Sequence, residues 1–318
     1  MYMTTKALQI GKTDADIILQ HTIKAQAWRA RFLFDSRAIA IGDTEGNLLV
    51  LDLERDNQES YTIARDHIVA IECIASPNQL LVGTLLQGVY WLNRSNNMIR
   101  QLSSLSIHVV HDIAVASLQN RIGIVGDHIA LVSLNIDDFD QKIVSAHVPN
   151  PSSIVFSPDS FVMAVGGGDE TDEKAHLCLY ETNNFEPLRV MTFADAICID
   201  RLAFDHKGYL LAAGGYQQCF LLDVRQVFVL CASFRMSSWV TALRFSGDGR
   251  WLFIGDDSGE VILYSTETNM IHHGRVEGIV LDVAFGMDGF FYIAYCQDEF
   301  SNGNKSSSIV VKKVHPTS

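Results

Sequence analysis

The sequence lacks cysteine pairs of the C-x-x-C kind. Its six cysteines are scattered along 318 residues, and most lie in apolar runs such as the one around Cys178. Disulfide frameworks occur mainly in short secreted chains, and zinc sites need closely spaced Cys or His ligands. We therefore expect free thiols in a reducing compartment, which predicts a cytoplasmic protein.

Basic clusters are also lacking. The chain has 24 Lys and Arg residues against 37 Asp and Glu residues, and its formal net charge is −13. Nucleic-acid-binding proteins normally carry a basic patch or stripe. No run of 18 apolar residues is present, and the N-terminal residues lack the apolar core of a signal peptide. The sequence predicts a soluble protein that binds neither nucleic acid nor membrane.

The motifs of common catalytic sites are absent as well. There is no G-x-S-x-G, H-E-x-x-H or phosphate-binding loop, and no Cys/His spacing typical of zinc. His272 and His273 form an isolated pair in an expected loop, and a metal there would need ligands from elsewhere. The acidic segment 166–174 lacks the flanking helices of a calcium or phosphate loop. We expect no catalytic residue, no metal and no cofactor.

What the sequence does contain is a repeat. In its clearest unit, residues 239–264, three apolar runs are separated by a Gly-Asp-Gly turn and an acidic glycine turn. This pattern predicts short strands joined by tight turns. A glycine that closes the second run recurs every 40–48 residues, with tyrosine in the seventh unit. These positions are Gly42, Gly83, Gly126, Gly166, Gly214, Gly255 and Tyr295.

Two apolar columns accompany these positions. Ten residues earlier stand Phe32, Cys73, Ala116, Phe156, Phe204, Phe245 and Phe285. Two residues before those stand Ala30, Ile71, Ala114, Ile154, Leu202, Leu243 and Val283. Apolar positions two apart mark the buried face of a strand, and units of about 40–45 residues with four strands are typical of propeller blades. The sequence predicts an all-β fold: a single domain over residues 1–318, a seven-bladed β-propeller with four-stranded antiparallel blades.

The two ends of the chain are expected to meet in the last blade. The seventh unit supplies only three strand-like runs, whereas residues 16–23 form a spare run before the first full unit. If this N-terminal strand pairs with the last blade, it completes four strands and closes the ring without an open blade interface.

The units resemble WD repeats, a propeller family whose third strand ends in Trp-Asp. Here the pair is degenerate: its first position is always bulky and apolar, as in Leu51-Asp52, and no unit has Trp-Asp itself. His147 occupies the family's histidine position in the fourth unit, with Asp169 near the position of its partner. The family's Gly-His pair is absent. The resemblance implies a rigid ring that binds proteins, and another propeller family is the alternative.

A binding surface is implied by the same resemblance, at the start of the first strand of each unit. Four residues before the Phe32 column stand Trp28, Val69, Asp112, Ser152, Asp200, Thr241 and Leu281. Large aromatic side chains beside polar groups suit protein recognition. The expected partner-binding residues are Trp28, Arg29, His67, Asp112, Asp200 and Trp239. Alternatively, the two Trp side chains wedge between blades. Arg29 and Arg201 occupy equivalent positions, from which either could pair with Asp282.

Three functions are compatible with this fold. We favour a non-enzymatic scaffold or recognition module for protein–protein interactions in a complex, whose acidic charge suits a partner protein or peptide with a basic surface. The alternative is a propeller enzyme, such as a lactonase-like hydrolase with a metal in the central channel, for which Asp112 and Asp200 are candidate ligands. A lipid-head-group sensor would need basic residues on a blade edge, which the chain lacks.

Overall fold

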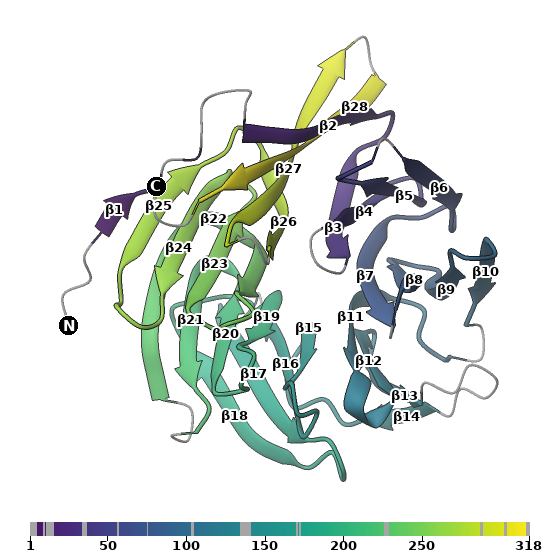
Figure 1. Ribbon diagram of the computed structural model, residues 1–318. Helices are drawn as coiled ribbons and strands as arrows, with labels where there is room; N and C mark the ends of the chain where they lie inside the picture. Colours follow the sequence, from purple (N-terminus) through teal and green to yellow (C-terminus); the bar gives the residue numbers. More distant parts are fainter. Residues whose placement is uncertain are drawn as a thin grey trace.

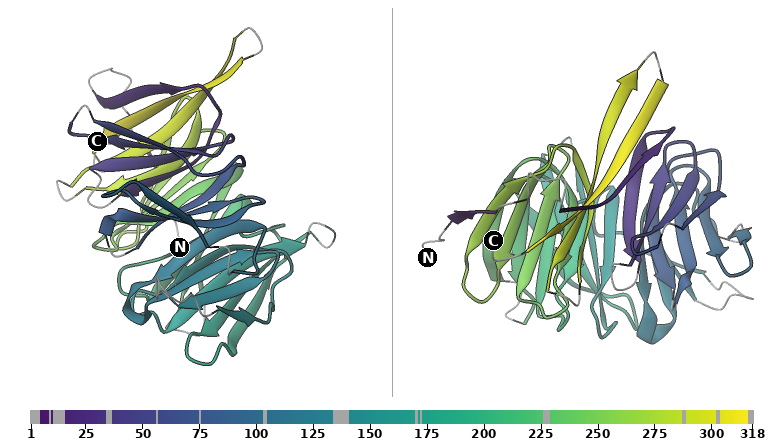
Figure 2. Two further views of the ribbon diagram at one scale, coloured as in Figure 1. Left: turned by 90° about the vertical axis from the view of Figure 1, so that its right-hand side faces the viewer. Right: turned by 45° about the horizontal axis from the view of Figure 1, so that its top comes forward.

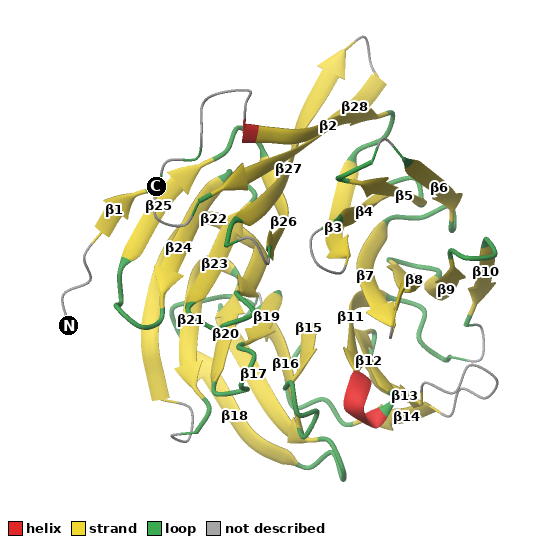
Figure 3. Cartoon of the chain, in the orientation of Figure 1, coloured by secondary structure: helices red, strands yellow, loops and turns green. Residues whose placement is uncertain are grey.

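The chain is built almost entirely of β-strands. The computed structural model describes residues 5–8, 10, 16–33, 37–55, 57–74, 76–102, 105–133, 141–169, 171, 173–225, 229–286, 289–301 and 304–315. Besides strands and turns, these residues include the short 3-10 helix Ser117–Gln119 (Figure 3). Over this part of the chain no helix has the length and apolar character needed to cross a membrane. The all-β prediction is confirmed.

Five of the sheets have four antiparallel strands each. The first comprises β3 (Ala27–Leu33), β4 (Ala38–Asp43), β5 (Asn47–Asp52) and β6 (Gln58–Thr62). The second comprises β7 (Ile68–Ile74), β8 (Ser76–Thr84), β9 (Gly88–Asn93) and β10 (Met98–Gln101). The third comprises β11 (Val110–Ala116), β12 (Arg121–Gly126), β13 (Ile129–Ser133) and β14 (Gln141–Val144). The fourth comprises β15 (Pro151–Phe156), β16 (Val162–Asp169), β17 (Lys174–Glu181) and β18 (Pro187–Phe193). The fifth comprises β26 (Ile279–Phe285), β27 (Phe291–Ser301), β28 (Asn304–Val314) and β2 (Ile17–Ile23).

The remaining sheet has eight strands because one long strand serves two groups. Its members are β19 (Arg201–Phe204), β20 (Leu210–Gly214), β21 (Tyr216–Asp223), β22 (Val229–Phe245), β23 (Trp251–Asp256), β24 (Glu260–Ser265), β25 (Ile271–Arg275) and β1 (Thr5–Ala7). The first half of β22 pairs with β21 and its second half pairs with β23. Division at β22 gives two groups of four, with β1 as an added parallel edge strand. We call the seven four-stranded groups blades 1–7, in chain order.

The innermost strands contact one another in chain order around a central axis, and β26 of blade 7 contacts β3 of blade 1 (Figure 1). As expected, the N-terminal strand β2 joins the last blade. It pairs antiparallel with β28, from Ile17 opposite Lys312 to Ile23 opposite Ser307. The β27–β28 hairpin extends beyond the ring, as both views of Figure 2 show.

The core lies between the blades. The described residues form seven clusters of buried apolar side chains, and each cluster combines two neighbouring blades. One cluster joins Phe32 and Ile39 of blade 1 to Ala294 and Ile309 of blade 7. A four-stranded sheet cannot bury both of its faces alone, so every blade depends on two neighbours.

Steric crowding between blades explains the glycine column. A Cβ added at Gly42 would lie 2.4 Å from Cγ2 of Ile68, which begins the inner strand of the next blade. A Cβ at Gly166 would lie equally close to Cγ2 of Ile199. The same relation holds for Gly83 with Val110, Gly214 with Val240 and Gly255 with Val280.

The predicted columns are wrong by one residue in two units. In blade 3 the residue opposite Asp112 is Val125, whereas Gly126 lies one residue later. A Cβ at Gly126 would collide with a backbone carbonyl, so this glycine has a separate steric cause. In blade 7 the corresponding residue is Ala294, not Tyr295. Because of the shift in blade 3, Asp112 lies one position further along its strand than Trp28 does in blade 1.

Candidate recognition face and central channel

Bulges mark the start of most inner strands. In six of the seven blades the register slips by one residue just after the inner strand begins. The extra residues are Trp28, Val69, His111, Ser152, Thr241 and Leu281. A bulge changes the direction of a side chain and is common beside functional sites. We call the end of the ring at which the inner strands begin the top face.

An exposed aromatic pair joins blades 1 and 2 on the top face. Trp28 is 52% exposed, and its ring meets the ring of His67 edge to face at a centroid distance of 5.6 Å. His67 directly precedes β7, and the carboxylate of the buried Asp66 accepts a hydrogen bond from its backbone N–H at 2.8 Å. The structure therefore brings together two of the residues that the sequence predicted for partner binding.

A second aromatic pair lies on the same face, at the junction of blades 5 and 6. Trp239 is 37% exposed, and its ring lies 5.1 Å from that of Tyr216. The two residues are also directly opposed in the β21–β22 pairing. Tyr216 carries no signal in the sequence, because it lies in the second hairpin of its unit and not at the start of an inner strand. Both Trp side chains face solvent, which does not agree with a wedge between blades.

A central cavity lies beside the residues that follow the bulges. In blade order these are Arg29, Ala70, Asp112, Ser153, Ala242 and Asp282, with Arg201 at the corresponding position of blade 5, which has no bulge. Five of these seven, together with their strand neighbours, surround a space of about 160 Å³. Asp112 lines this cavity, whereas Trp28, with which the sequence aligned it, is exposed.

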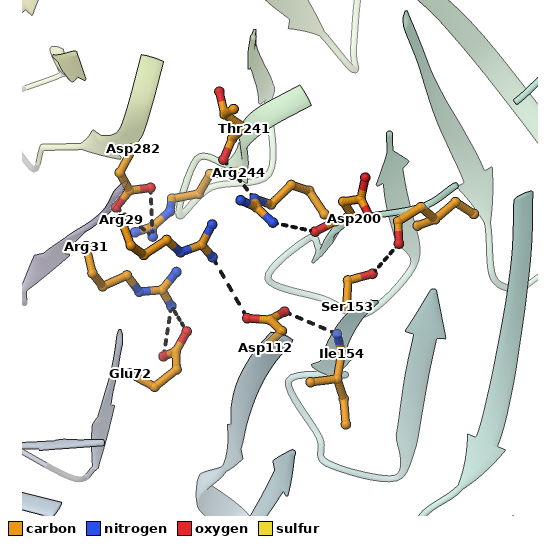
Figure 4. A network of polar contacts seen from close by, with 12 residues as sticks. Arg29, Arg31, Glu72, Asp112, Ser153, Ile154, Asp200, Thr241, Arg244 and Asp282 are labelled. Atoms are coloured by element: carbon orange, nitrogen blue, oxygen red, sulfur yellow. Dashed lines mark hydrogen bonds and ion pairs between the residues drawn. The ribbon is translucent and has the colours of Figure 1, made fainter. Parts of the chain in front are cut away.

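Ion pairs join the inner strands around the cavity (Figure 4). Arg31 Nη2 of blade 1 lies 2.8 and 3.0 Å from the carboxylate oxygens of Glu72 in blade 2. Arg244 Nη2 of blade 6 lies 3.2 and 3.3 Å from those of Asp282 in blade 7. Asp282 also accepts a 2.8 Å hydrogen bond from the backbone N–H of Phe32, which links blade 7 to blade 1.

Two further guanidinium groups are less well neutralised. Arg29 Nη2 lies 3.9 Å from Oδ1 of Asp112, beyond hydrogen-bonding distance. Arg201 donates to the backbone carbonyls of Thr241, at 2.8 Å, and Asp200, at 2.6 Å. The predicted pairing of Arg29 or Arg201 with Asp282 is therefore wrong, because the ion-pair partner of Asp282 is Arg244. No sequence motif marks the neighbours Arg31, Glu72 and Arg244 as members of this network.

Asp200 lies apart from the cavity lining. It precedes β19, and its carboxylate accepts a 2.8 Å hydrogen bond from the thiol of Cys198. Asp112 instead lines the cavity, where its Oδ2 accepts a 3.2 Å hydrogen bond from the backbone N–H of Ile154. The two carboxylates therefore do not hold equivalent positions, contrary to expectation.

The remaining candidates do not form a site. Among the described residues no three His, Cys, Asp or Glu side chains are grouped closely enough to hold a metal ion. His272 and His273 lie in strand β25 and not in the expected loop. His147 contacts Tyr180, whose hydroxyl accepts its backbone N–H at 3.0 Å, whereas the side chain of Asp169 lies outside the described residues. Part of the acidic segment 166–174 also lies outside them.

Comparison with known proteins supports the propeller prediction. Residues 226–265 match the sequence model of the WD domain, G-beta repeat. No curated protein matches the sequence. Among solved structures, the β-propeller domain of Cps50 (Swd1) from Myceliophteria thermophila matches with a TM-score of 0.72 and 13% identity. The match covers 92% of this chain and 99% of that domain. The β-propeller fold is therefore confirmed, and the matched repeat agrees with the WD-repeat resemblance.

Proposed function

We propose that the chain acts as a single-domain, non-enzymatic recognition module that binds a partner protein or peptide through its top face. The observation that carries this proposal is the presence of two exposed aromatic pairs on one face of a rigid ring. Trp28 and His67 form one pair at the junction of blades 1 and 2, and Trp239 and Tyr216 form the other at the junction of blades 5 and 6.

The arrangement of these pairs suits a protein interface. Trp and Tyr dominate the energetics of many interfaces because they bury a large area with little loss of side-chain freedom. Each Trp here is already held by a neighbouring ring, and each sits on a strand of the blade framework. A partner would therefore meet side chains that need little further ordering, which lowers the entropic cost of binding.

Charge would act mainly on the rate of encounter. The net charge of −13 attracts a partner with a basic surface over distances of about one Debye length, which is about 8 Å at physiological ionic strength. Such steering changes the association rate more than the final affinity. The six free thiols support a cytoplasmic location, where thiols stay reduced.

The geometry favours recognition over a hydrolase with a channel metal. A hard cation needs several convergent carboxylates that are not already neutralised. In the cavity, Glu72 and Asp282 contact the guanidinium groups of Arg31 and Arg244. Asp112 is the remaining lining carboxylate, and it faces Arg29. Around the cavity the guanidinium groups, four with Arg201, thus outnumber the three carboxylates.

The experiment uses the full chain as bait in affinity purification, followed by titration of the purified partner. Trp28→Ala and Trp239→Ala should each weaken binding by roughly tenfold or more, the effect expected for an aromatic hot spot. Phe161→Ala is the matched control, because Phe161 is also exposed, at 56%, but lies after the end of inner strand β15, on the opposite face.

Thermal unfolding of the same variants tests the alternative. If the two Trp variants lose stability and bind the partner as tightly as the unmodified chain, these side chains are structural and the proposed face is wrong. Equal weakening by Phe161→Ala would also contradict the proposal, since the effect would not be specific to the top face.

A further inference from the structure

The central cavity carries a charge arrangement that the proposed recognition function does not use. Its volume of about 160 Å³ would hold about five water molecules at the density of the liquid, or one small polyatomic ion. Inner strands from all the blades contribute to its lining, and Arg29, Arg31 and Arg201 lie among the lining residues.

Most of the acidic groups around the cavity are already engaged. Glu72 is held by Arg31 through contacts of 2.8 and 3.0 Å. Asp282 accepts hydrogen bonds from Arg244 and from the backbone of Phe32. These carboxylates therefore have little capacity left to neutralise further cations.

Asp112 is the lining carboxylate that remains for Arg29 and Arg201. Arg29 lies 3.9 Å from Asp112, and within the described part of the chain its guanidinium donates no hydrogen bond. Arg201 uses two of its N–H groups on backbone carbonyls, which carry no full charge. Oδ2 of Asp112 is itself bonded to the backbone of Ile154. Two cations thus face a single carboxylate at this end of the cavity.

This arrangement has an energetic cost. The Arg29 side chain is only 16% exposed, and a buried cation is expensive unless it is paired and hydrogen-bonded. Burial, and next the positive charge of Arg201, lower the pKa of Arg29 to about 10, while Asp112 opposes this change. An anion placed between the two guanidinium groups would supply both the missing charge and the missing acceptors.

We propose that Arg29 and Arg201 form a binding site for a small phosphate-like oxyanion within the central cavity. A guanidinium group presents its N–H donors in a fork that matches the oxygens of a phosphate, and such charge-assisted hydrogen bonds are stronger than neutral ones. Asp112 tunes the affinity by competing with the anion for Arg29. This site is separate from the top-face aromatic pairs and does not depend on the proposed partner.

The test measures binding of inorganic phosphate to the full chain by isothermal titration calorimetry, with ionic strength held constant by sodium chloride. We expect saturable binding that Arg29→Met weakens by roughly tenfold or more, since one charge-assisted pair is lost. Arg37→Met is the matched control: it removes the same group from a surface position that is 69% exposed, and it should leave the phosphate affinity unchanged.

A second variant predicts a change of opposite sign. Asp112→Asn keeps an oxygen that can accept from Ile154 but removes the competing charge, so phosphate should bind several-fold more tightly. If Arg29→Met fails to fold, this comparison alone decides the matter. The proposal is overturned if phosphate binds no better than chloride, if Arg29→Met and Arg37→Met bind alike, or if Asp112→Asn fails to tighten binding.

Discussion

Replacement of Gly42 by alanine tests the packing of neighbouring blades directly. The new Cβ would lie 2.4 Å from Cγ2 and 2.5 Å from Cβ of Ile68, which is fully buried. Carbon atoms pack at about 3.5–4.0 Å, so the two inner elements would have to separate by about 1 Å or more. Neither atom belongs to the far end of a flexible side chain, and rotation cannot relieve the clash.

The expected loss of stability follows from this clash. Overpacking of a core costs about 1–3 kcal/mol, and the lower flexibility of the unfolded alanine variant returns about 0.4–1 kcal/mol. Because the overlap is severe, we expect Gly42→Ala to lower the free energy of unfolding by about 2 kcal/mol. Gly247→Ala is the control, since a Cβ at Gly247 meets nothing within 4 Å and its φ is not positive. Urea denaturation followed by tryptophan fluorescence measures both.

A double variant separates the clash from other effects of the substitution. Ile68→Gly removes both Cγ2 and Cβ, the two atoms that the Cβ of Gly42→Ala would meet, and leaves a space that this Cβ can occupy. The pair should therefore cost less than the sum of the two single variants, with a coupling of about 0.5–3 kcal/mol. If Gly42→Ala is as stable as Gly247→Ala, or if the two costs simply add, the contact between blades 1 and 2 is not as close as described.

Three further predictions concern closure, the polar belt and the thiols. Deletion of residues 1–24 removes β2 and should lower the melting temperature of the whole ring. Deletion of residues 1–10 removes β1 but leaves β2, and it should lower the melting temperature less. Equal melting temperatures for the two truncated chains and the full chain would contradict closure by β2. Asp282→Ala should cost about 2–4 kcal/mol in thermal unfolding, because it strips a buried N–H and a guanidinium of their acceptor, and Asp282→Asn should cost less. A thiol reagent at pH 8 should modify Cys231 first, since it is the exposed cysteine, and modification of the fully buried thiols before unfolding would refute this burial pattern. The fully buried thiols are those of Cys178, Cys219 and Cys296, and burial raises the pKa of each.

The sequence predicted those features that recur in most blades because packing requires a particular residue size or polarity. Gly42 and its equivalents recur because a residue at or near the start of the next blade's inner segment leaves no space for a Cβ. Phe32 and the residues aligned with it are apolar because each blade buries its faces against two neighbours. Residues 16–23 stood out as a strand because the last unit lacked one. These properties depend on residue size and polarity, which a single sequence displays.

The wrong predictions concern features of backbone geometry that residue type does not reveal. In blade 3 the sequence aligns Gly126 with the other glycines. Gly126 is instead required because a Cβ there would collide with the carbonyl oxygen of Val109, and Val125 holds the position equivalent to Gly42. The bulges shift six of the seven inner strands by one residue, and the extra residue is neither glycine nor proline. The Arg31–Glu72 pair joins residues 41 apart in the chain, and without the ring no spacing rule connects them. The sequence could therefore place candidate residues near the correct strand ends. It could not show which of them face solvent and which line the cavity.

At the bulge in β3, two adjacent residues belong to two different surfaces. Trp28, the extra residue, is exposed to solvent, whereas Arg29, the next residue, lines the cavity. Trp28→Ala should consequently weaken partner binding with the phosphate affinity unchanged, and Arg29→Met should do the reverse. If both variants weakened the same partner to the same extent, the partner would insert an anionic group into the channel, and the two sites would have to be treated as one.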